Sequence, residues 1–310
     1  MEQTRDEPLH GRGPMPVPHL DPLPLRLVEL SGKQLDYLTT VLERWREEHG
    51  LVSASAIKAV RVFTQYCSPA DACDVGLALT AEFQLLFFAI NDMPDGAEKP
   101  TILAEMQMVL QGHPAGDNGL LKATAALRSL VLKTFGEVET VRLFRLLEQM
   151  LAAFLREAQQ ADDMPPVALY RENRQHTIAA HPYVELFRLA ERVQPPPAVW
   201  PALTALEKLC VEIIYLTNDI LSVKRDLRKN KYNIVIGLAR DSDTTYEDAL
   251  SQVNGLLKRT VDEFLAARDE LLRDEALDER TRKYVDHLGS ILEGNRVATV
   301  ALTARYIGND

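Results

Sequence analysis

The pattern of apolar and polar positions is helical from about residue 31 onward. Apolar residues recur at steps of three and four, which places them on one stripe of a helix. A clear example is the set Phe144, Leu147, Leu151 and Phe154. Strand-like alternation is scarce, and its best candidate is the stretch 233–238 (NIVIGL), which lies between helical stretches. The pattern therefore predicts an all-α protein.

Turn-forming residues divide this helical pattern at several places. The segments between them have ordinary helix lengths, and they predict roughly ten helices. No internal repeat and no long low-complexity linker is visible, so one helical domain is the economical interpretation. The predicted breaks lie at Gly50, Ser68-Pro69, Asp95-Gly96, His113 to Gly119, Gly136, Pro165-Pro166, Pro195 to Pro197, Asn230 and Asp241 to Thr245.

The first 28 residues differ from the rest because they contain six prolines and few apolar residues before Leu25. Each proline lacks an amide donor and restricts the residue before it, so regular structure is disfavoured. We therefore expect residues 1–28 to form a disordered or extended arm. Residues 29–310 are expected to form the helical domain.

Charge and cysteine content narrow the functional classes. The chain carries 35 basic and 45 acidic residues, a net charge of −10, which argues against nucleic acid and membrane surfaces as partners. Cys67, Cys73 and Cys210 lack metal-ligand spacing and are interpreted as reduced thiols. The most apolar run, Val75–Ile90, is too short to span a membrane, and no signal peptide is visible. We therefore expect a cytoplasmic protein with no membrane span.

The first candidate for chemistry is the segment Asn91-Asp92-Met93-Pro94-Asp95-Gly96, which follows a helix that is apolar on nearly all sides. Pro94 and Gly96 end that helix. Asp92 and Asp95 lie three residues apart, so they are expected on one face at the C-terminal end of the helix. Carboxylates are ligands for Mg²⁺, but such a segment is also typical of a polar turn.

The second candidate is the set Asn218, Ser222 and Asp226, which share one stripe of a helix because they are spaced at steps of four. An amide oxygen, a hydroxyl and a carboxylate together make a compact oxygen site for one Mg²⁺. The neighbouring Asp219 is expected to point elsewhere. Alone, such a triplet is a weak signal, because ordinary residue frequencies produce it by chance.

Two further segments offer phosphate donors and a helix break. The pair Arg305-Tyr306 near the C-terminus presents a guanidinium fork and a phenol to phosphate oxygens. The stretch Tyr170–Pro182 contains the small pair Ala179-Ala180 before a proline, which predicts a helix broken near its middle. Such a break frees backbone carbonyls to point into a cavity. A plain connection between two helices is the alternative interpretation.

Together these four segments resemble the bacterial and fungal class I terpene synthases (terpene cyclases), and the resemblance covers most of the chain. That family has, in order, an aspartate-rich motif, a sensor arginine before a broken helix, an Asn-Ser-Asp/Glu triad and a C-terminal Arg-Tyr pair. Here 44 residues separate Arg174 from Asn218, and 87 separate Asn218 from Arg305, which is similar to the family's layout. The resemblance implies a single-domain helical bundle around a deep central cavity.

The resemblance also implies an activity: Mg²⁺-dependent ionisation of a linear isoprenyl diphosphate, followed by cyclisation of the carbocation to a cyclic terpene hydrocarbon or alcohol. Two Mg²⁺ ions would be held by Asp92, with Asp95 and Asn91 as further candidates, and a third by Asn218, Ser222 and Asp226. The diphosphate would be bound by Arg174, Arg225, Arg305 and Tyr306. The linker and effector positions of the broken helix correspond to Thr177, Ile178 and Ala179. A homodimer is typical of the family.

The remaining cavity is expected to be apolar and closed, because a carbocation must avoid water until cyclisation is complete. Residues 291–304 contain no aromatic residue, and small residues such as Ala298 would leave the cavity floor wide. We therefore expect geranylgeranyl diphosphate in preference to farnesyl diphosphate. Aromatic candidates for the wall, which are also typical of a plain core, are Phe63, Phe83, Phe87, Phe88 and Tyr215.

Some residues depart from the family pattern. Asn91 stands where the family usually has the first of two aspartates, and Ala179 replaces a common glycine. Two alternatives stay open. A chain-elongating prenyl diphosphate synthase would carry a second aspartate-rich motif at 218–226, which this sequence lacks. A non-catalytic helical binding protein descended from a cyclase is favoured only by Asn91.

Overall fold

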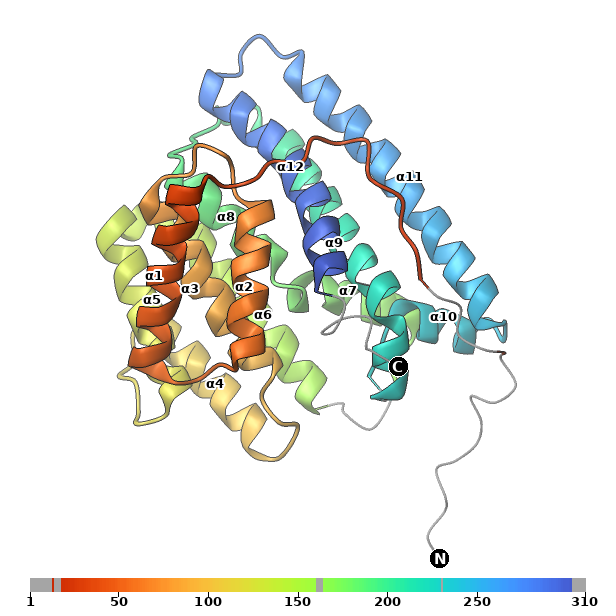
Figure 1. The fold of residues 1–310 in the computed structure, drawn as a ribbon, viewed down its shortest axis with the longest axis horizontal. Helices are drawn as coiled ribbons and strands as arrows, with labels where there is room; N and C mark the ends of the chain where they lie inside the picture. Colours follow the sequence, from red (N-terminus) through yellow and green to blue (C-terminus); the bar gives the residue numbers. More distant parts are fainter. Residues whose placement is uncertain (1–12, 14–17, 160–163, 230, 303–310) are drawn as a thin grey trace, which may run out of the picture.

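A computed structural model describes residues 13, 18–159, 164–229 and 231–302. Every regular element in these residues is a helix, which confirms the all-α prediction (Figure 1). The twelve described helices are α1 (Gly32–His49), α2 (Ala54–Cys67), α3 (Asp74–Asn91), α4 (Glu98–Leu110), α5 (Gly119–Phe135), α6 (Glu137–Gln159), α7 (Val167–Thr177), α8 (Ala180–Ala190), α9 (Trp200–Arg228), α10 (Ile234–Asp241), α11 (Tyr246–Leu272) and α12 (Glu279–Ala301).

Two long apolar helices organise the core. Helix α3 packs against α1, α2, α5 and α8, and helix α9 packs against α10, α11 and α12. Helix α3 is the one described helix that is long and apolar enough, by length and composition, to cross a membrane, and 72% of it is buried inside the protein. Such burial is typical of a core helix. Buried apolar residues from all these helices form one continuous cluster.

Helix ends follow local chemistry, and they correct one expectation. Ser31 and Gln34 form a capping box at the start of α1, and Gly50 ends that helix with φ 62°. The stretch 233–238, the best strand candidate, is instead the start of α10. Asn233 caps it by accepting a hydrogen bond from the amide of Val235. A short apolar run does not distinguish a buried helix from a strand, so the pattern alone was ambiguous.

The described residues before α1 form an extended segment that crosses α12 (Figure 1). The amide of Leu23 donates to Glu293 Oε2 at 2.9 Å, and Arg296 Nη1 donates to the Leu20 carbonyl at 3.5 Å. Residues 18–28 are therefore docked on the helical domain rather than loose. The rest of the predicted arm, residues 1–12 and 14–17, lies outside the described residues.

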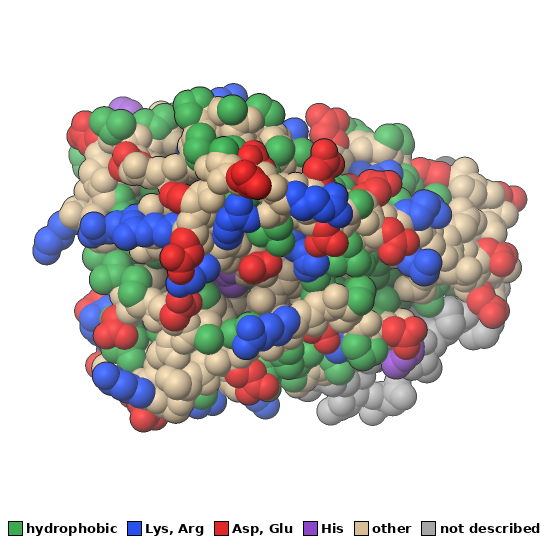
Figure 2. All heavy atoms as spheres, turned by 90° about the horizontal axis from the view of Figure 1, so that it is seen from above, with side chains coloured by type: hydrophobic (Ala, Val, Ile, Leu, Met, Phe, Trp, Pro, Cys, Tyr) green, Lys and Arg blue, Asp and Glu red, His purple; other side chains and the backbone are tan. Residues whose placement is uncertain are grey.

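The charges on the surface and the state of the cysteines can be compared with what the sequence predicts. On the face in Figure 2, acidic and basic side chains are interspersed, and no basic stripe of the kind that binds nucleic acid is seen there. Cys67 and Cys210 are buried, Cys73 is exposed, and all three are free. The interpretation of the cysteines as reduced thiols therefore holds.

Candidate active site

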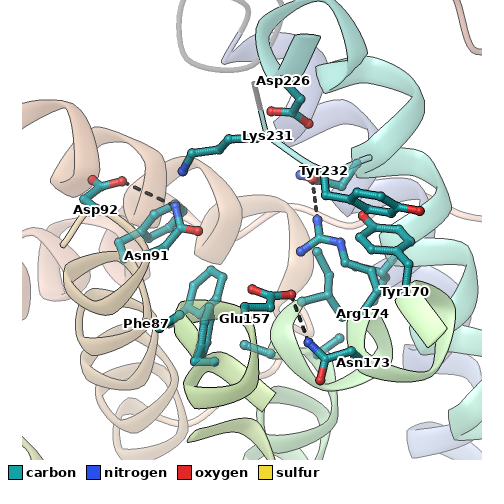
Figure 3. Close-up of a pocket in the computed structure, with 18 of the residues that line it drawn as sticks. Phe87, Asn91, Asp92, Glu157, Tyr170, Asn173, Arg174, Asp226, Lys231 and Tyr232 are labelled. Carbon is teal, nitrogen blue, oxygen red and sulfur yellow. Dashed lines mark hydrogen bonds between the residues drawn. The ribbon is translucent and has the colours of Figure 1, made fainter. Parts of the chain in front are cut away.

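A cavity of about 500 Å³ lies between α2, α3, α6, α7, α8, α9 and α12. Its lining includes Asp92 at the end of α3, Arg174 of α7, and both Asn218 and Asp226 of α9; Figure 3 labels Asp92, Arg174 and Asp226. Residues that are far apart in the sequence therefore meet at one concave site. An enclosed cavity with a few convergent polar groups is the usual form of a small-molecule site.

Helix α3 brings an acidic group to the cavity because the helix ends there, with Asn91 as its last residue and Asp92 as its C-cap. Asn91 Nδ2 donates to Asp92 Oδ1 at 3.4 Å (Figure 3). Asp95 lies beyond the helix end, after Pro94, so the expectation that Asp92 and Asp95 share one helical face is wrong. Asp95 accepts a hydrogen bond from Lys99 at 2.7 Å, and this bond lowers the pKa of its carboxyl. Asp95 lines the cavity, but a lysine already pairs with it.

Helix α9 carries Asn218, Ser222 and Asp226 along one stripe, as steps of four require. Asn218 and Asp226 line the cavity, whereas Ser222 is fully buried and is not part of its wall. Ser222 Oγ donates to Asp226 Oδ2 at 2.5 Å. The same carboxylate accepts from Arg225 Nε at 2.9 Å and from Asn233 Nδ2 at 3.0 Å. Ser222 and Asp226 are therefore linked by a hydrogen bond with Arg225 beside them, whereas Asn218 Oδ1 accepts from Arg174.

Arg174 is held by two adjacent residues of α9. Its Nη2 donates to Asn218 Oδ1 at 2.9 Å, and its Nε donates to Asp219 Oδ1 at 3.1 Å. Tyr170 also donates its hydroxyl to Asp219. Burial lowers the pKa of Arg174, but the nearby carboxylates, Asp219 first, outweigh it and the net pKa is raised. Asp219 was expected to point elsewhere; it does leave the Asn218 stripe, but it points at Arg174 and belongs to the site.

The helix break lies beside the cavity. Helix α7 ends at Thr177 and α8 begins at Ala180, and between them Ala179 has φ 62°. That left-handed conformation favours glycine, which fits the position where the resembled family commonly has one. Ile178 and Ala179 line the cavity, whereas Thr177 is buried and does not. The stretch is therefore a broken helix, and its backbone reaches the cavity wall.

Glu157 is a cavity residue that sequence reasoning missed. It lies on α6, and its Oε1 accepts from Thr177 Oγ1 at 2.9 Å and from Asn173 Nδ2 at 3.1 Å (Figure 3). The side chain is exposed because it faces the open cavity, yet protein atoms surround its other sides. This desolvation raises the pKa of Glu157, and the charge of Arg174 partly offsets the rise. On an amphipathic helix such a residue resembles any solvent-facing glutamate, so the sequence carried no signal for it.

The apolar part of the wall is aromatic. Phe87 lies with its ring centroid 5.4 Å from that of Phe88 and 6.2 Å from that of Phe154. Tyr215 and Ala298 do not line the cavity. Ile214 lines it, so Tyr215, one residue later on α9, is rotated by about 100° and bonds to Glu212 instead. Ala298 is fully buried by neighbouring helices. The phenylalanines that line the cavity are Phe63, Phe83, Phe87, Phe88 and Phe154, and the tyrosines are Tyr170, Tyr183 and Tyr232.

The oxygen donors of the cavity fit a hard divalent cation such as Mg²⁺. Asp92 stands on one side, Asp226 and Asn218 belong to the opposite helix, and Lys231 extends between the two sides (Figure 3). Carboxylate and amide oxygens, completed by ligand oxygens, are what Mg²⁺ prefers. Within the described ranges no group of three or more His, Cys, Asp and Glu side chains that could hold a metal ion is assembled. Arg305-Tyr306 lies outside the described residues, and its role stays a prediction.

Comparison with known proteins agrees with the family resemblance seen in the sequence. The family model for "Terpene synthase family 2, C-terminal metal binding" matches residues 82–263. Sesquiterpene synthase Agr8 of Cyclocybe aegerita is 27% identical over 239 residues, which cover 74% of this chain and 67% of that protein. Terpene cyclase 4 of Gibberella fujikuroi is 26% identical over 149 residues, 47% of this chain, and the match spans only 40% of that relative's length. The crystal structure of 2-methylisoborneol synthase from Streptomyces coelicolor, in complex with Mg²⁺ and 2-fluoroneryl diphosphate, has the same fold, with a TM-score of 0.79, 16% identity and coverage of 94% and 97%.

Proposed function

Because the chain belongs to terpene synthase family 2 and is a terpene cyclase, we propose that its cavity binds a linear isoprenyl diphosphate and ionises it with the help of Mg²⁺. One observation carries the proposal. Asp92, Arg174 and Asp226 converge on a cavity that is also lined by a group of phenylalanines, Phe83, Phe87 and Phe88 among them. That arrangement separates a region for an anion and its cations from a region for a hydrocarbon chain.

The polar region has the groups that ionisation requires. Diphosphate leaves only when its developing negative charge is neutralised by preorganised positive groups. Bound Mg²⁺ would supply most of that neutralisation. We propose that three ions are held by Asp92, Asn218, Ser222 and Asp226. Arg174 and Arg225 would donate to phosphate oxygens, joined by Arg305 and Tyr306 from the C-terminal segment.

The aromatic region protects the carbocation. Phe83, Phe87 and Phe88 line it and exclude water from the reacting carbons. An aromatic face stabilises a desolvated cation by about 1–2 kcal/mol, so successive cations along the cyclisation path would be favoured. Residues around the break at Ile178 and Ala179 lie at the junction of the two regions and would orient the substrate.

The substrate is proposed to be farnesyl diphosphate. The expectation of geranylgeranyl diphosphate depended on Ala298 widening the cavity floor, but Ala298 is fully buried away from the wall. The relative Agr8 is named a sesquiterpene synthase, which favours a C15 chain. Incubation of the purified protein with Mg²⁺ and C10, C15 or C20 diphosphates, followed by gas chromatography–mass spectrometry, tests this choice. A cyclic product from the C15 substrate is expected; a product from the C20 substrate alone contradicts it.

The role of the α9 stripe is tested by Asn218→Ala. Loss of one oxygen ligand from a preorganised charge site should lower the rate of diphosphate release by about 100-fold or more. Lys224→Ala is the matched control, because Lys224 lies on the same helix but not on the cavity wall. Circular dichroism should show both variants folded. A wild-type rate of diphosphate release in Asn218→Ala would contradict the proposed role of the triad.

Location and assembly are separate matters. The expectations of a cytoplasmic protein and of a homodimer stay predictions. Cell fractionation and light scattering, respectively, measure them.

A further inference from the structure

The deep part of the cavity is not uniformly apolar. Gln84 lines it from α3, eight residues before Asp92, which corresponds to about 12 Å along the helix axis. Tyr183 lines the same region from α8, and Cys67 lines it from the end of α2. The polar groups therefore lie far from the proposed diphosphate region, where the hydrocarbon chain would be.

The Tyr183 hydroxyl is buried without a hydrogen-bond partner among the described residues, and Tyr183 is only 8% exposed. The Ser68 hydroxyl, at the end of α2, also lacks a hydrogen-bond partner among the described residues, and Ser68 is 1% exposed. Burial raises the pKa of Tyr183 well above its usual range, while the Ser68 hydroxyl and the Gln84 amide act to lower it. Both groups therefore lie close to the phenol.

The Gln84 amide is oriented by a fixed contact. Its Nε2 donates to Thr64 Oγ1 at 3.2 Å, and Thr64 is fully buried. This leaves the carbonyl oxygen of Gln84 as the acceptor that remains. A phenol, a hydroxyl and an amide oxygen thus lie close together, and the phenol and the hydroxyl have no hydrogen-bond partner among the described residues.

Buried polar groups in proteins are rarely left unpaired, because desolvation without a hydrogen bond is costly. Buried polar groups that lack a protein partner and lie close together are commonly satisfied by a water molecule, which makes two to four hydrogen bonds. The set formed by Tyr183, Ser68 and Gln84 meets that requirement. Two of its members, Tyr183 and Gln84, line the cavity in which the proposed cyclisation takes place.

Resting on the function proposed above, we propose that Tyr183, Ser68 and Gln84 hold a water molecule that adds to the final carbocation, so that the product is a cyclic terpene alcohol. A lone pair of the water oxygen forms a C–O bond to the cationic carbon and gives a protonated alcohol. That species then loses one proton to solvent water, because the released diphosphate lies at the far end of the cavity. The net addition is one water molecule, and no oxidant or reductant is required.

The test uses the full chain with Mg²⁺ and farnesyl diphosphate in H₂¹⁸O, with diphosphate release and product masses measured together. The expected product is an alcohol that carries one ¹⁸O atom. A product mixture that is hydrocarbon only, with normal diphosphate release, overturns the water site but leaves the cyclase function intact. Absence of diphosphate release with every C10 to C20 substrate overturns the proposed function, and the water site with it.

Tyr183→Phe removes only the hydroxyl, so it should fold and release diphosphate within about threefold of the wild-type rate. We expect its alcohol-to-hydrocarbon ratio to fall at least tenfold, and Ser68→Ala to shift the ratio in the same direction. Tyr215→Phe is the matched control, because that tyrosine does not line the cavity, and its ratio should not change. An unchanged ratio in both Tyr183→Phe and Ser68→Ala overturns the assignment.

Discussion

Arg174 is oriented by a carboxylate that does not itself line the cavity. Asp219 is almost fully buried, and it accepts from Arg174 and from Tyr170 on the side away from the Asn218 stripe. A charged hydrogen bond of this kind fixes the planar guanidinium in one orientation. Arg174 therefore presents its remaining donors to the cavity before any ligand arrives.

Replacement of Asp219 by Asn tests this arrangement. The volume is kept and the charge is lost, so Arg174 should become less well oriented. We expect kcat to fall by about 10- to 100-fold, in line with the cost of small misplacements at a reacting centre. Steady-state kinetics measure this fall, and Asp262→Asn, an exposed position on α11, serves as control. Wild-type kcat in Asp219→Asn would contradict a positioning role.

The sequence predicted the directions and contacts of some site residues but not of others. Asn218 and Asp226 could be placed on one stripe because helical spacing fixes their directions. Glu157 could not, because its relation to Thr177 depends on how α6 packs against α7. The shared face of Asp92 and Asp95 was predicted wrongly because α3 ends at Asn91, and the pattern also does not reveal that Lys99 pairs with Asp95.

At the scale of elements, α12 and α2 approach each other more closely than side chains normally allow. A Cβ added at Gly294 would lie 1.9 Å from the carbonyl oxygen of Tyr66. No heavy atoms tolerate such a distance, so only glycine fits. The contact places Asn295 and Ile291 of α12 beside Cys67 of α2 in the cavity wall.

Gly294→Ala should therefore destabilise the protein, because backbone must move to admit one methyl group. Overpacking of this kind costs about 1–3 kcal/mol, and a clash with backbone falls at the upper end. Urea unfolding measures the loss. Gly255→Ala on α11 is the control, because its Cβ would meet only the end of the Arg259 side chain at 3.6 Å. There the better helix propensity of alanine should raise stability by about 0.5–1 kcal/mol; equal effects at both sites would contradict the argument.

Most helix boundaries were predictable from glycine, proline and capping residues. The break between α11 and α12, at residues 273–278, was not, because it contains neither glycine nor proline. Its one local signal is Asp278, which caps α12 by accepting from the Thr281 amide at 2.7 Å. A capping aspartate among many charged residues does not stand out.

At the scale of the whole molecule, a buried ionic network joins four helices. Arg142 of α6 bonds to Glu185 of α8 and to Glu207 of α9, and both carboxylates are fully or almost fully buried. Tyr284 of α12 donates to Glu207 Oε1 at 2.8 Å. The network therefore fixes the relative positions of helices that carry the cavity wall.

Arg142→Met should be strongly destabilising, because it leaves Glu207 buried without its guanidinium. Loss of one partner of a buried pair costs about 3–5 kcal/mol. Burial already raises the pKa of Glu207, and Arg142 partly offsets that rise. Without Arg142 the folded-state pKa rises further above the unfolded value, so stability is retained at low pH and lost as pH increases.

Urea unfolding of Arg142→Met at pH 5 and pH 8 measures this dependence, and a larger loss is expected at pH 8. Arg259→Met, at an exposed position of α11, should be nearly neutral at both pH values. An equal loss at pH 5 and pH 8 would show that the network does not contain an ionised Glu207.

The convergence of distant segments is a property of the whole molecule that spacing alone does not give. The order of Asp92, Arg174, Asn218 and Arg305 is similar to that of a known family, and the shared cavity was predicted from that resemblance. Packing then determined which neighbours of these residues reach it, which is why Phe87 lines the cavity and Tyr215 does not.

The docked segment before α1 and the part of α12 that holds it should differ in how well they tolerate substitutions. The segment's hydrogen bonds use backbone groups, the amide of Leu23 and the carbonyl of Leu20, whereas α12 contributes the side chains of Glu293 and Arg296. A carbonyl is present at any residue, and an amide is present at any residue except proline. Leu20, Leu23 and Leu25 also pack against the core. Substitutions that keep these apolar contacts can therefore accumulate along the segment while its path is inherited, whereas an exchange at Glu293 or Arg296 removes a side chain that holds it.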